Sequence, residues 1–333
     1  MISAIVMAAG KGTRMHSDLA KTMHKVLDKP MVDHIYGTLK SVGVEHIVYV
    51  VGYGADTVRE HMGDKVIFAV QQPQLGSGHA VMQADVLKGI KGKTLIINGD
   101  CPLITAETYN RMLACADEYP LVLLTVRLQN PAHYGRIVRD ENGSVLRITE
   151  FKDCTPEEVK INEINAGIYC VDNELLWQYL PEIENNNAQK EYYVTDLVEI
   201  FNRHGHRVTA VVSDDPDEMS GINDRKELAR ATKWLQRKVN YGWMAKGVEI
   251  IDPETTYIGT DVVIGKDTTV YPGVRIEGKT VIGERNVITE GSYINNCHIG
   301  NNNRIIASRL SNAEIEDDTE LGPWLNLVGD RDN

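Results

Sequence analysis

The sequence has 333 residues, more than a single compact hydrophobic core usually organises, and it therefore predicts two domains. Hydrophobic residues make up 42% of the chain and charged residues 25%, which is typical of a soluble folded protein. The formal net charge of -12 argues against DNA, RNA and anionic lipid as partners, because such a chain repels them at long range.

The first nine residues are apolar, but they are too short to cross a bilayer and carry no positively charged leader. We interpret them as a buried strand and expect a cytoplasmic protein. The five cysteines, at 101, 115, 154, 170 and 297, are odd in number and lack Cys-x-x-Cys spacing. We therefore expect free thiols in a reducing compartment, with neither a disulfide framework nor a zinc site.

Strand and helix patterns alternate over the first hundred residues. The predicted elements are a strand at 2–7, a helix with Met31, Ile35, Leu39 and Val42 on one face, strands at 46–51 and 66–70, a helix near 79–87 and a strand at 94–98. This alternation predicts an α/β fold, a Rossmann-like, mostly parallel sheet with helices on both faces. Ligands of such sheets bind beyond the carboxyl ends of the strands.

The middle of the chain, residues 121–212, mixes short strands at 122–127 and 164–171 with a helix near 195–203. We expect this part to extend the sheet and to build a second wall of the site. The apolar spacing over 223–246 then predicts one long amphipathic connecting helix.

Beyond this helix an aliphatic residue recurs every six positions. The members of the series are Ile258, Ile264, Val270, Ile276, Ile282, Ile288 and Ile294, followed after one-residue slips by Ile299 and Ile305, and then by Ile315, Leu321 and Leu327. Such a repeat builds a short left-handed parallel β-helix of about four coils, in which the aliphatic side chains point inward. The chain thus divides into an α/β domain (1–222), a connecting helix (223–246) and a β-helix (247–333).

The loop MAAGKGTRM at 7–15 follows the first strand and offers bare backbone amides to an anion. Because the chain is acidic overall, an anionic substrate needs local cations, and Lys11, Arg14 and Lys21 are the candidates. The third glycine of a dinucleotide-binding loop and the Lys-Ser or Lys-Thr of a P-loop are absent from this stretch. An ordinary strand-to-helix turn would leave the glycines and cations unexplained.

Eight segments in order along the chain resemble the sugar nucleotidyltransferase (pyrophosphorylase) family, in particular its N-acetylglucosamine-1-phosphate uridyltransferases. They are AAGKGTRM (8–15), QQPQLGSGHA (71–80), NGDCPL (98–103), YGRI (134–137), TEFKD (149–153), EINAGIY (163–169), NNNAQKEYYVTD (185–196) and GINDR (221–225). The resemblance implies a nucleotidyltransferase domain that joins UTP to a sugar 1-phosphate and releases pyrophosphate. It also implies UTP and N-acetylglucosamine 1-phosphate as substrates and a cell-wall precursor as product.

The resemblance assigns nucleotide contacts to two loops. Ala8, Ala9 and Gly10 approach the nucleotide through their backbone, although Met7 replaces the family's leucine just before them. Gln71, Gln74 and Gly76 read the uracil edge, since amide side chains both donate and accept hydrogen bonds. Ser77 stands where the family often has threonine.

The metal site is expected at Asp100, because a carboxylate at the end of a central strand is placed to hold Mg2+ against phosphates. By the resemblance, Asn223 supplies a second oxygen ligand. One Asp and one Asn suffice when nucleotide phosphates and waters complete the shell. Together with the metal, Lys11, Arg14 and Lys21 neutralise charge on the transferred phosphate.

Sugar recognition is assigned to four residues by the same resemblance, namely Gly135, Glu150, Asn165 and Thr195. Tyr192 and Tyr193 either line the sugar wall or pack in the core. Three hypotheses stay open from the sequence: the uridyltransferase, a nucleotidyltransferase that uses another NTP or another sugar 1-phosphate, and a catalytically silent regulatory subunit.

Longer members of the family are bifunctional and also transfer an acetyl group. In LGPWLNLVGD (321–330), Asn326 and Val328 occupy positions where those enzymes have arginines, and we expect no acetyltransferase activity. Relatives associate through their β-helices, and we expect a homotrimer here as well. Trp324 and Leu325 are candidates for capping the last coil.

Overall fold

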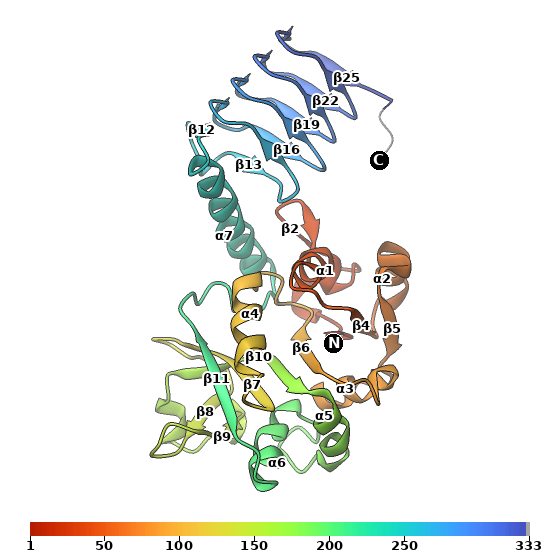
Figure 1. Cartoon of the computed structure of the whole chain (residues 1–333), viewed down its shortest axis with the longest axis vertical. Coiled ribbons are helices and arrows are strands. Elements are labelled where there is room, and N and C mark those ends of the chain that lie inside the picture. Colours follow the sequence, from red (N-terminus) through yellow and green to blue (C-terminus); the bar gives the residue numbers. More distant parts are fainter. Residues whose placement is uncertain (331–333) are drawn as a thin grey trace. The chain divides into compact units, whose positions relative to one another are not determined.

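The computed structural model describes residues 1–330, which form two compact units (Figure 1). The first unit consists of Met1–His24 and Pro30–Glu227, and the second of Lys25–Lys29 together with the chain from Leu228 onward. None of the helices among residues 1–330 has the length and apolar character that crossing a bilayer requires.

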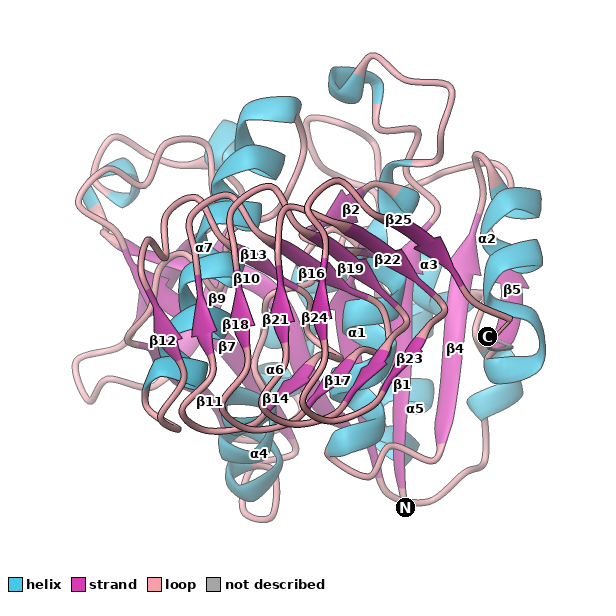
Figure 2. Cartoon of the chain, turned by 90° about the horizontal axis from the view of Figure 1, so that it is seen from above, coloured by secondary structure: helices cyan, strands magenta, loops and turns pink. Residues whose placement is uncertain are grey.

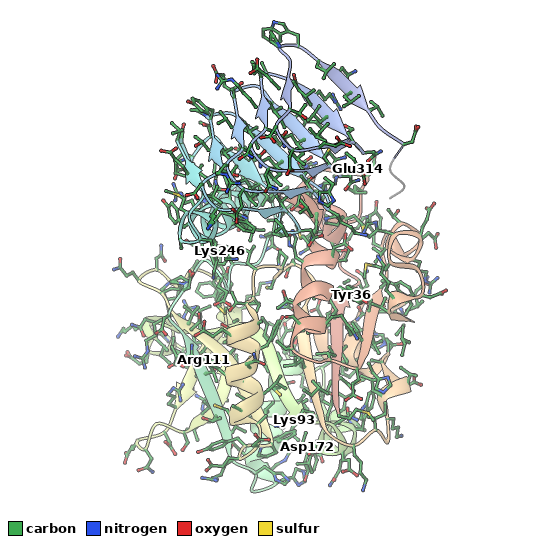
Figure 3. The ribbon with its side chains drawn as sticks, turned by 45° about the horizontal axis from the view of Figure 1, so that its top comes forward. Tyr36, Lys93, Arg111, Asp172, Lys246 and Glu314 are labelled. Atoms are coloured by element: carbon green, nitrogen blue, oxygen red, sulfur yellow. The ribbon has the colours of Figure 1, made fainter. Side chains whose placement is uncertain are left out.

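The first unit is built on a mixed, mostly parallel sheet in the order β11-β7-β10-β6-β1-β4-β5. Its strands are β1 (Ile2–Ala8), β4 (His46–Val51), β5 (Ile67–Val70), β6 (Lys93–Asn98), β7 (Leu121–Arg127), β10 (Glu163–Asp172) and β11 (Val208–Ser213). β10 runs antiparallel to both β6 and β7, and Asp172 of β10 lies opposite Lys93 of β6 (Figure 3). A hairpin of β8 (Arg136–Arg139) and β9 (Val145–Thr149) joins the sheet through β10.

Helices cover both faces of this sheet, as the alternation predicts. They are α1 (Met31–Ser41), α2 (Ala55–Met62), α3 (Ser77–Met82), α4 (Ala106–Cys115), α5 (Asn173–Tyr179) and α6 (Leu197–Arg203). Ala4 and Val6 of β1 pack into one buried cluster with α1 and α4, whereas Ile5 packs into a second cluster with α3, α5 and α6. A central strand with helices on both sides needs mostly apolar residues, and six of the seven residues of β1 are apolar, the exception being the buried Ser3.

Two helix predictions are wrong in detail. The helix expected near 79–87 is instead α3 followed by a separate 3-10 turn, Asp85–Leu87, because Ala84 leaves the helical region of backbone space. The helix expected from 195 begins as a 3-10 turn, Val194–Asp196, and becomes α-helical only at Leu197. The second turn contains Thr195, one of the expected site residues.

The second unit contains most of the long helix α7 (Arg225–Met244), shorter at both ends than predicted, and a three-sided parallel β-helix. The first side of the β-helix consists of β12 (Glu249–Ile250), β15 (Thr269–Val270), β18 (Val287–Ile288), β21 (Arg304–Ile305) and β24 (Glu320–Leu321). The second side consists of β13 (Tyr257–Ile258), β16 (Arg275–Glu277), β19 (Tyr293–Asn295), β22 (Arg309–Ser311) and β25 (Asn326–Val328). The third side consists of β14 (Val263–Ile264), β17 (Val281–Ile282), β20 (His298–Ile299) and β23 (Glu314–Ile315). Strands of the first side lie next to one another in Figure 2. The short strands β2 (Lys25–Val26) and β3 (Lys29–Pro30) pair with each other.

The repeat residues form the core of the β-helix, and the predicted fold class is confirmed. The slips in the series are shortened corners between strands. Ile258 pairs with Ile276, which is eighteen positions later in the sequence. Ile282 pairs with Ile299, seventeen positions later, and Ile299 pairs with Ile315, sixteen positions later. The sequence series omitted Leu310, which is fully buried and fills the inward place between Ile305 and Ile315. The capping role suggested for Trp324 is wrong, because this side chain is 84% exposed.

Candidate functional site

The carboxyl ends of β1 and β6 form the floor of the candidate site. These strands are parallel neighbours, with Met7 opposite Asn98, so the loop after β1 and Asp100 emerge at the same edge of the sheet. In that loop Gly12 adopts a φ of +60°, and a Cβ there would lie 2.7 Å from the Cβ of Lys21. Only glycine allows this close approach. Lys11 and Arg14 are exposed on the same loop.

Lys21, Asp100 and Asn223 meet at the centre of the site, although they are far apart in the sequence. Lys21 Nζ lies 2.5 Å from Asp100 Oδ2 and donates a hydrogen bond of 3.2 Å to Asn223 Oδ1. The Lys21 and Asp100 side chains are 14% and 19% exposed, so water only partly screens the ion pair. Lys21 lies in a 3-10 turn, Lys21–Met23, after the 7–15 loop.

The segment around Asn223 is fixed by hydrogen bonds to its neighbours. The amide of Ile222 donates to the Asp100 carbonyl oxygen at 2.9 Å, and the amide of Asn223 donates to Glu227 Oε2 at 2.6 Å. Asp224 caps the start of α7 by accepting from the amides of Lys226 and Glu227 at 2.7 and 2.8 Å. The bond from the Glu227 amide is the main reason that the pKa of Asp224 is lowered.

These contacts test whether the centre fits a hard divalent cation. Asp100 Oδ2 and Asn223 Oδ1 converge on one ammonium nitrogen, which shows that a single cation can touch both oxygens. Carboxylate and amide oxygens are the donors that Mg2+ prefers. Within residues 1–330 no group of three or more His, Cys, Asp or Glu side chains is arranged to hold a metal. The donor set therefore fits a cation that takes its remaining ligands from substrate and water.

The segment 71–77, which is expected to read the base, folds against the 7–15 loop. Gln74 donates its side-chain amide to the Ala9 carbonyl oxygen, and Gln71 donates to the Gly76 carbonyl oxygen at 2.8 Å. Gly76 has a φ of +106°, and a Cβ there would lie 2.5 Å from the Tyr192 carbonyl oxygen. Ser77 Oγ accepts from the Val194 amide at 3.0 Å. Gln71 is only 5% exposed, so in this structure its amide holds the loop.

Three of the four expected sugar-binding residues adjoin one another. Gly135 faces Glu150, because a Cβ on this glycine would lie 3.4 Å from both carboxylate oxygens. Its carbonyl oxygen accepts from the Asn165 amide at 2.9 Å, and the Asn165 side chain donates to the Tyr169 hydroxyl at 2.8 Å. Burial and then the charge of Asp153 raise the pKa of Glu150.

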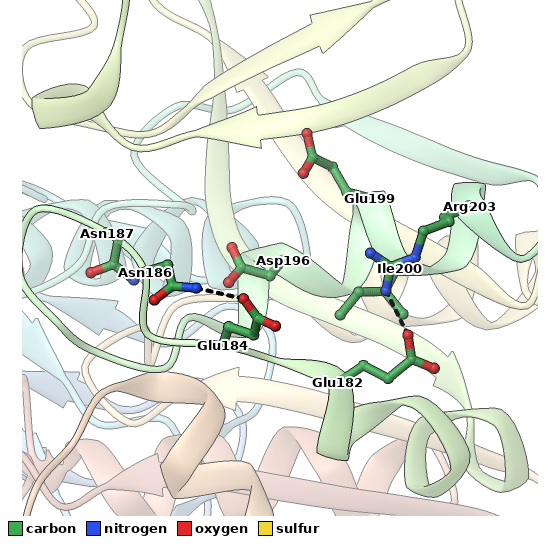
Figure 4. Close-up of a pocket in the computed structure, with 8 residues that line it drawn as sticks. All are labelled: Glu182, Glu184, Asn186, Asn187, Asp196, Glu199, Ile200 and Arg203. Atoms are coloured by element: carbon green, nitrogen blue, oxygen red, sulfur yellow. Dashed lines mark hydrogen bonds and ion pairs between the residues drawn. The ribbon is translucent and has the colours of Figure 1, made fainter.

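The fourth residue, Thr195, is 5% exposed, and its hydroxyl has no hydrogen-bond partner within the described chain. Thr195 and Glu150 both line a pocket of about 300 Å³. An adjoining pocket of about 480 Å³ is strongly acidic (Figure 4); it is lined by Glu182, Glu184, Asn186, Asn187, Asp196, Glu199, Ile200 and Arg203. Asp196 and Glu199 line both pockets.

The sequence reasoning missed three residues near the centre. The pKa of the Tyr134 hydroxyl is raised by burial and then by the charges of Cys101, Glu227 and Asp100, so this side chain belongs to the electrostatic surroundings of the site. The Cys101 thiol lies 3.6 Å from Asp100 Oδ1. Tyr134 and Cys101 directly adjoin Gly135 and Asp100 in the sequence, which was the available signal. Glu227 had no such signal in the sequence, because its hydrogen bond to the Asn223 amide forms only in the folded chain.

A cation-bearing glycine loop and an Asp–Asn pair lie at the carboxyl edge of a mostly parallel α/β sheet, which is where such sheets bind their ligands. The nucleotidyl transferase family model matches residues 3–244, and a model for the bacterial transferase hexapeptide (six repeats) matches 261–296.

Similar proteins are each called "Bifunctional protein GlmU". The protein of Halalkalibacterium halodurans is 43% identical to this chain, over 97% of the chain and 72% of its own length. The protein of Lactobacillus johnsonii is 47% identical, over 97% of the chain and 71% of its own length. The protein of Pediococcus pentosaceus is 45% identical, over 98% of the chain and 70% of its own length. The chain belongs to the GlmU family of nucleotidyltransferases. It is thus an enzyme of the UDP-N-acetylglucosamine pyrophosphorylase type.

Proposed function

We propose that the chain transfers a uridylyl group from UTP to N-acetylglucosamine 1-phosphate in a Mg2+-dependent reaction, giving UDP-N-acetylglucosamine and pyrophosphate. Membership of the GlmU family supports uridylyl transfer for UDP-N-acetylglucosamine synthesis. The observation that supports the metal and phosphate chemistry is the convergence of Lys21, Asp100 and Asn223 on one point beside the glycine loop.

The residues around this point supply charge. An oxygen of the sugar phosphate attacks the α-phosphorus of UTP, and pyrophosphate leaves from the opposite side. Two anions must approach each other, so Lys11, Arg14 and Lys21 stabilise the negative charge that develops. The attacking phosphate is already ionised at neutral pH and needs no general base. Asp100 and Asn223 would hold Mg2+, which supplies charge neutralisation and a fixed geometry for the phosphates.

Nucleotide binding is proposed for the two loops beside this centre, and sugar binding for four residues on other segments. Ala8, Ala9 and Gly10 approach the nucleotide, and the 71–77 segment with Gln71, Gln74, Gly76 and Ser77 surrounds the base. Gly135, Glu150, Asn165 and Thr195 bind the sugar. The unpartnered Thr195 hydroxyl supports this assignment, because a buried hydroxyl gains most from a ligand that completes its hydrogen bond.

Three further properties are proposals. The chain lacks acetyltransferase activity, which is supported by the neutral and exposed side chains of Asn326 and Val328. It forms a homotrimer through its β-helix, where Val263 is 50% and Tyr271 38% exposed. It acts in the cytoplasm, in keeping with five cysteines that form no disulfide within residues 1–330. Acetyl-CoA turnover with glucosamine 1-phosphate and light scattering in solution test the first two.

Pyrophosphate release tests the main proposal. The purified chain receives Mg2+, each common NTP in turn, and either N-acetylglucosamine 1-phosphate or glucose 1-phosphate. We expect release with UTP and N-acetylglucosamine 1-phosphate, and loss of release in excess EDTA. A preference for another pair would favour the alternative nucleotidyltransferase, and no release with any pair would favour a silent regulatory subunit.

The metal site is tested with Asp100→Asn, and Asp33→Asn is the matched control. Asp33 also forms an ion pair with a basic side chain, His61, at 2.7 Å, but on the outer helix α1. We expect Asp100→Asn to weaken Mn2+ binding to the UTP-loaded enzyme, measured by electron paramagnetic resonance, and to lower turnover about 100-fold. Unchanged Mn2+ binding would show that the metal lies elsewhere.

A further inference from the structure

Arg136, at the start of β8, is a buried cation that the proposed mechanism does not use. Its side chain is only 2% exposed. The guanidinium donates to the carbonyl oxygens of Pro131, Ala132 and Tyr134; the distance is 3.4 Å to Pro131 and 2.9 Å to Ala132. These acceptors are backbone carbonyl groups and carry no formal charge.

Burying a guanidinium costs free energy unless its N–H groups are satisfied. Here the two terminal nitrogens donate to the loop just before Arg136 in the chain, whereas the buried Nε has no partner among the described residues. That loop is strained. Ala132 has a φ of +44°, in the left-handed region that a residue with a Cβ adopts only when other contacts enforce it. Arg136 bonds the carbonyl oxygen of this same alanine. The arginine therefore holds residues 131–135 in a conformation that they would not keep alone.

Arg136 also contacts Phe151, in the segment that carries Glu150. Its Cζ lies 5.6 Å from the ring centroid of Phe151, at cation–π distance. The His133 ring meets the same phenyl ring edge-on, with centroids 4.6 Å apart. Phe151 directly follows Glu150. One guanidinium and one phenyl ring thus join the segment that carries Gly135 to the segment that carries Glu150.

We propose that Arg136 is a positioning residue for the sugar subsite: by binding three carbonyl groups and stacking on Phe151, it fixes the distance between Gly135 and Glu150. The inference rests on the proposed function only in assigning these two residues to the sugar. Arg136 does not touch substrate. Loss of Arg136 weakens binding of the sugar phosphate and leaves the UTP loops, 8–15 and 71–77, unchanged.

Steady-state kinetics of pyrophosphate release distinguish this role from a general structural one. The variants are Arg136→Lys, which keeps the charge but not the planar fork, and Phe151→Leu, which removes the aromatic face and keeps the arginine. Arg139→Gln is the matched control, because Arg139 lies on the same strand and also makes three side-chain hydrogen bonds, two to the Glu163 carboxylate and one to the Gly143 carbonyl oxygen.

We expect Arg136→Lys and Phe151→Leu each to raise the KM for N-acetylglucosamine 1-phosphate about tenfold while the KM for UTP changes less than about twofold. Arg139→Gln should lower the melting temperature and leave both KM values unchanged. Calorimetric titration of UDP-N-acetylglucosamine gives a second readout without turnover, and the same two variants should weaken its binding about tenfold.

Equal rises of both KM values, or no change in either, would overturn the inference. So would a sugar-specific effect of Arg139→Gln, which would show that any damage to the hairpin has this result. If the wild type releases no pyrophosphate from this substrate pair, the proposed function fails. Calorimetry then tests the inference separately. The inference is wrong if the two variants bind UDP-N-acetylglucosamine as tightly as the wild type, or if the wild type does not bind it.

Discussion

Replacing Asp196 by asparagine should stabilise the protein at neutral pH. Asp196 is half-buried immediately before α6 and lines both pockets, of which Figure 4 shows the larger one. Burial, and then the charges of Glu199, Glu150 and Asp153, raise its pKa from 3.8 to about 6. The ionised form is thus disfavoured in the folded state, which is a cost that an uncharged amide of the same shape avoids.

The sign and size follow from proton linkage. Because the folded state holds the proton more tightly than the unfolded state, ionisation of Asp196 removes stability as the pH rises from about 4 through 6. Two pKa units correspond to roughly 3 kcal/mol, and solvent screening of a half-exposed carboxylate reduces this to about 1–2 kcal/mol. The gain from Asp196→Asn should therefore be about 1–2 kcal/mol at pH 8 and near zero at pH 4.

Thermal unfolding measured at several pH values between 4 and 8 checks this expectation. For a domain of this size, the gain corresponds to a melting temperature about 2–6 °C higher at pH 8. Glu60→Gln, on the exposed face of α2, controls for the loss of one negative charge from an acidic chain. A gain that is the same at pH 4 and pH 8, or a loss at pH 8, would refute the electrostatic reasoning.

Three further predictions concern other parts of the first unit. Lys21→Met should lower kcat for pyrophosphate release about 100-fold, because it removes a charge contact from the centre, and a near-normal kcat would contradict its role. Glu218→Gln should lower the free energy of unfolding in urea by about 1–3 kcal/mol. Glu218 is 4% exposed and accepts from the Thr105 amide at 2.5 Å and the Thr108 hydroxyl at 2.8 Å, so an unaltered urea midpoint would be unexpected. Gly76→Ala should raise the KM for UTP and cost about 1–3 kcal/mol of stability, because the new Cβ meets the Tyr192 carbonyl oxygen at a φ that alanine rarely adopts. A wild-type KM in this variant would show that the 71–77 loop adapts freely.

The sequence was sufficient where a pattern is local and repeated. The central strands are continuous apolar runs that match their predicted positions within a residue or two, and His46–Val51 matches fully. The inward aliphatic residues of the β-helix were read from their period alone. Leu310 was missed because the corners on both sides of it are shortened, which breaks the period at this position.

The site was predictable only in part. Gly12 and Asp100 were found because each follows a strand, and the fold brings strand ends to one edge. Lys21 and Asn223 lie 202 residues apart, and the family resemblance assigned both to the site without predicting the hydrogen bond between them. Arg136 carried no signal, since a lone arginine after glycine is usually a surface residue. Its burial depends on the conformation of the loop before it and on Phe151, which local patterns do not reveal.

The unequal coils of the β-helix indicate where this chain tolerates insertions and deletions. Each strand keeps its pairing and its inward aliphatic residue, while the corners lose one or two residues between the coil that starts at Ile258 and the one that starts at Ile299. A residue removed from a strand would instead turn the next aliphatic side chain toward water. Length variation between the coils is thus confined to the corners, and the paired strands with their inward aliphatic residues stay the same from coil to coil.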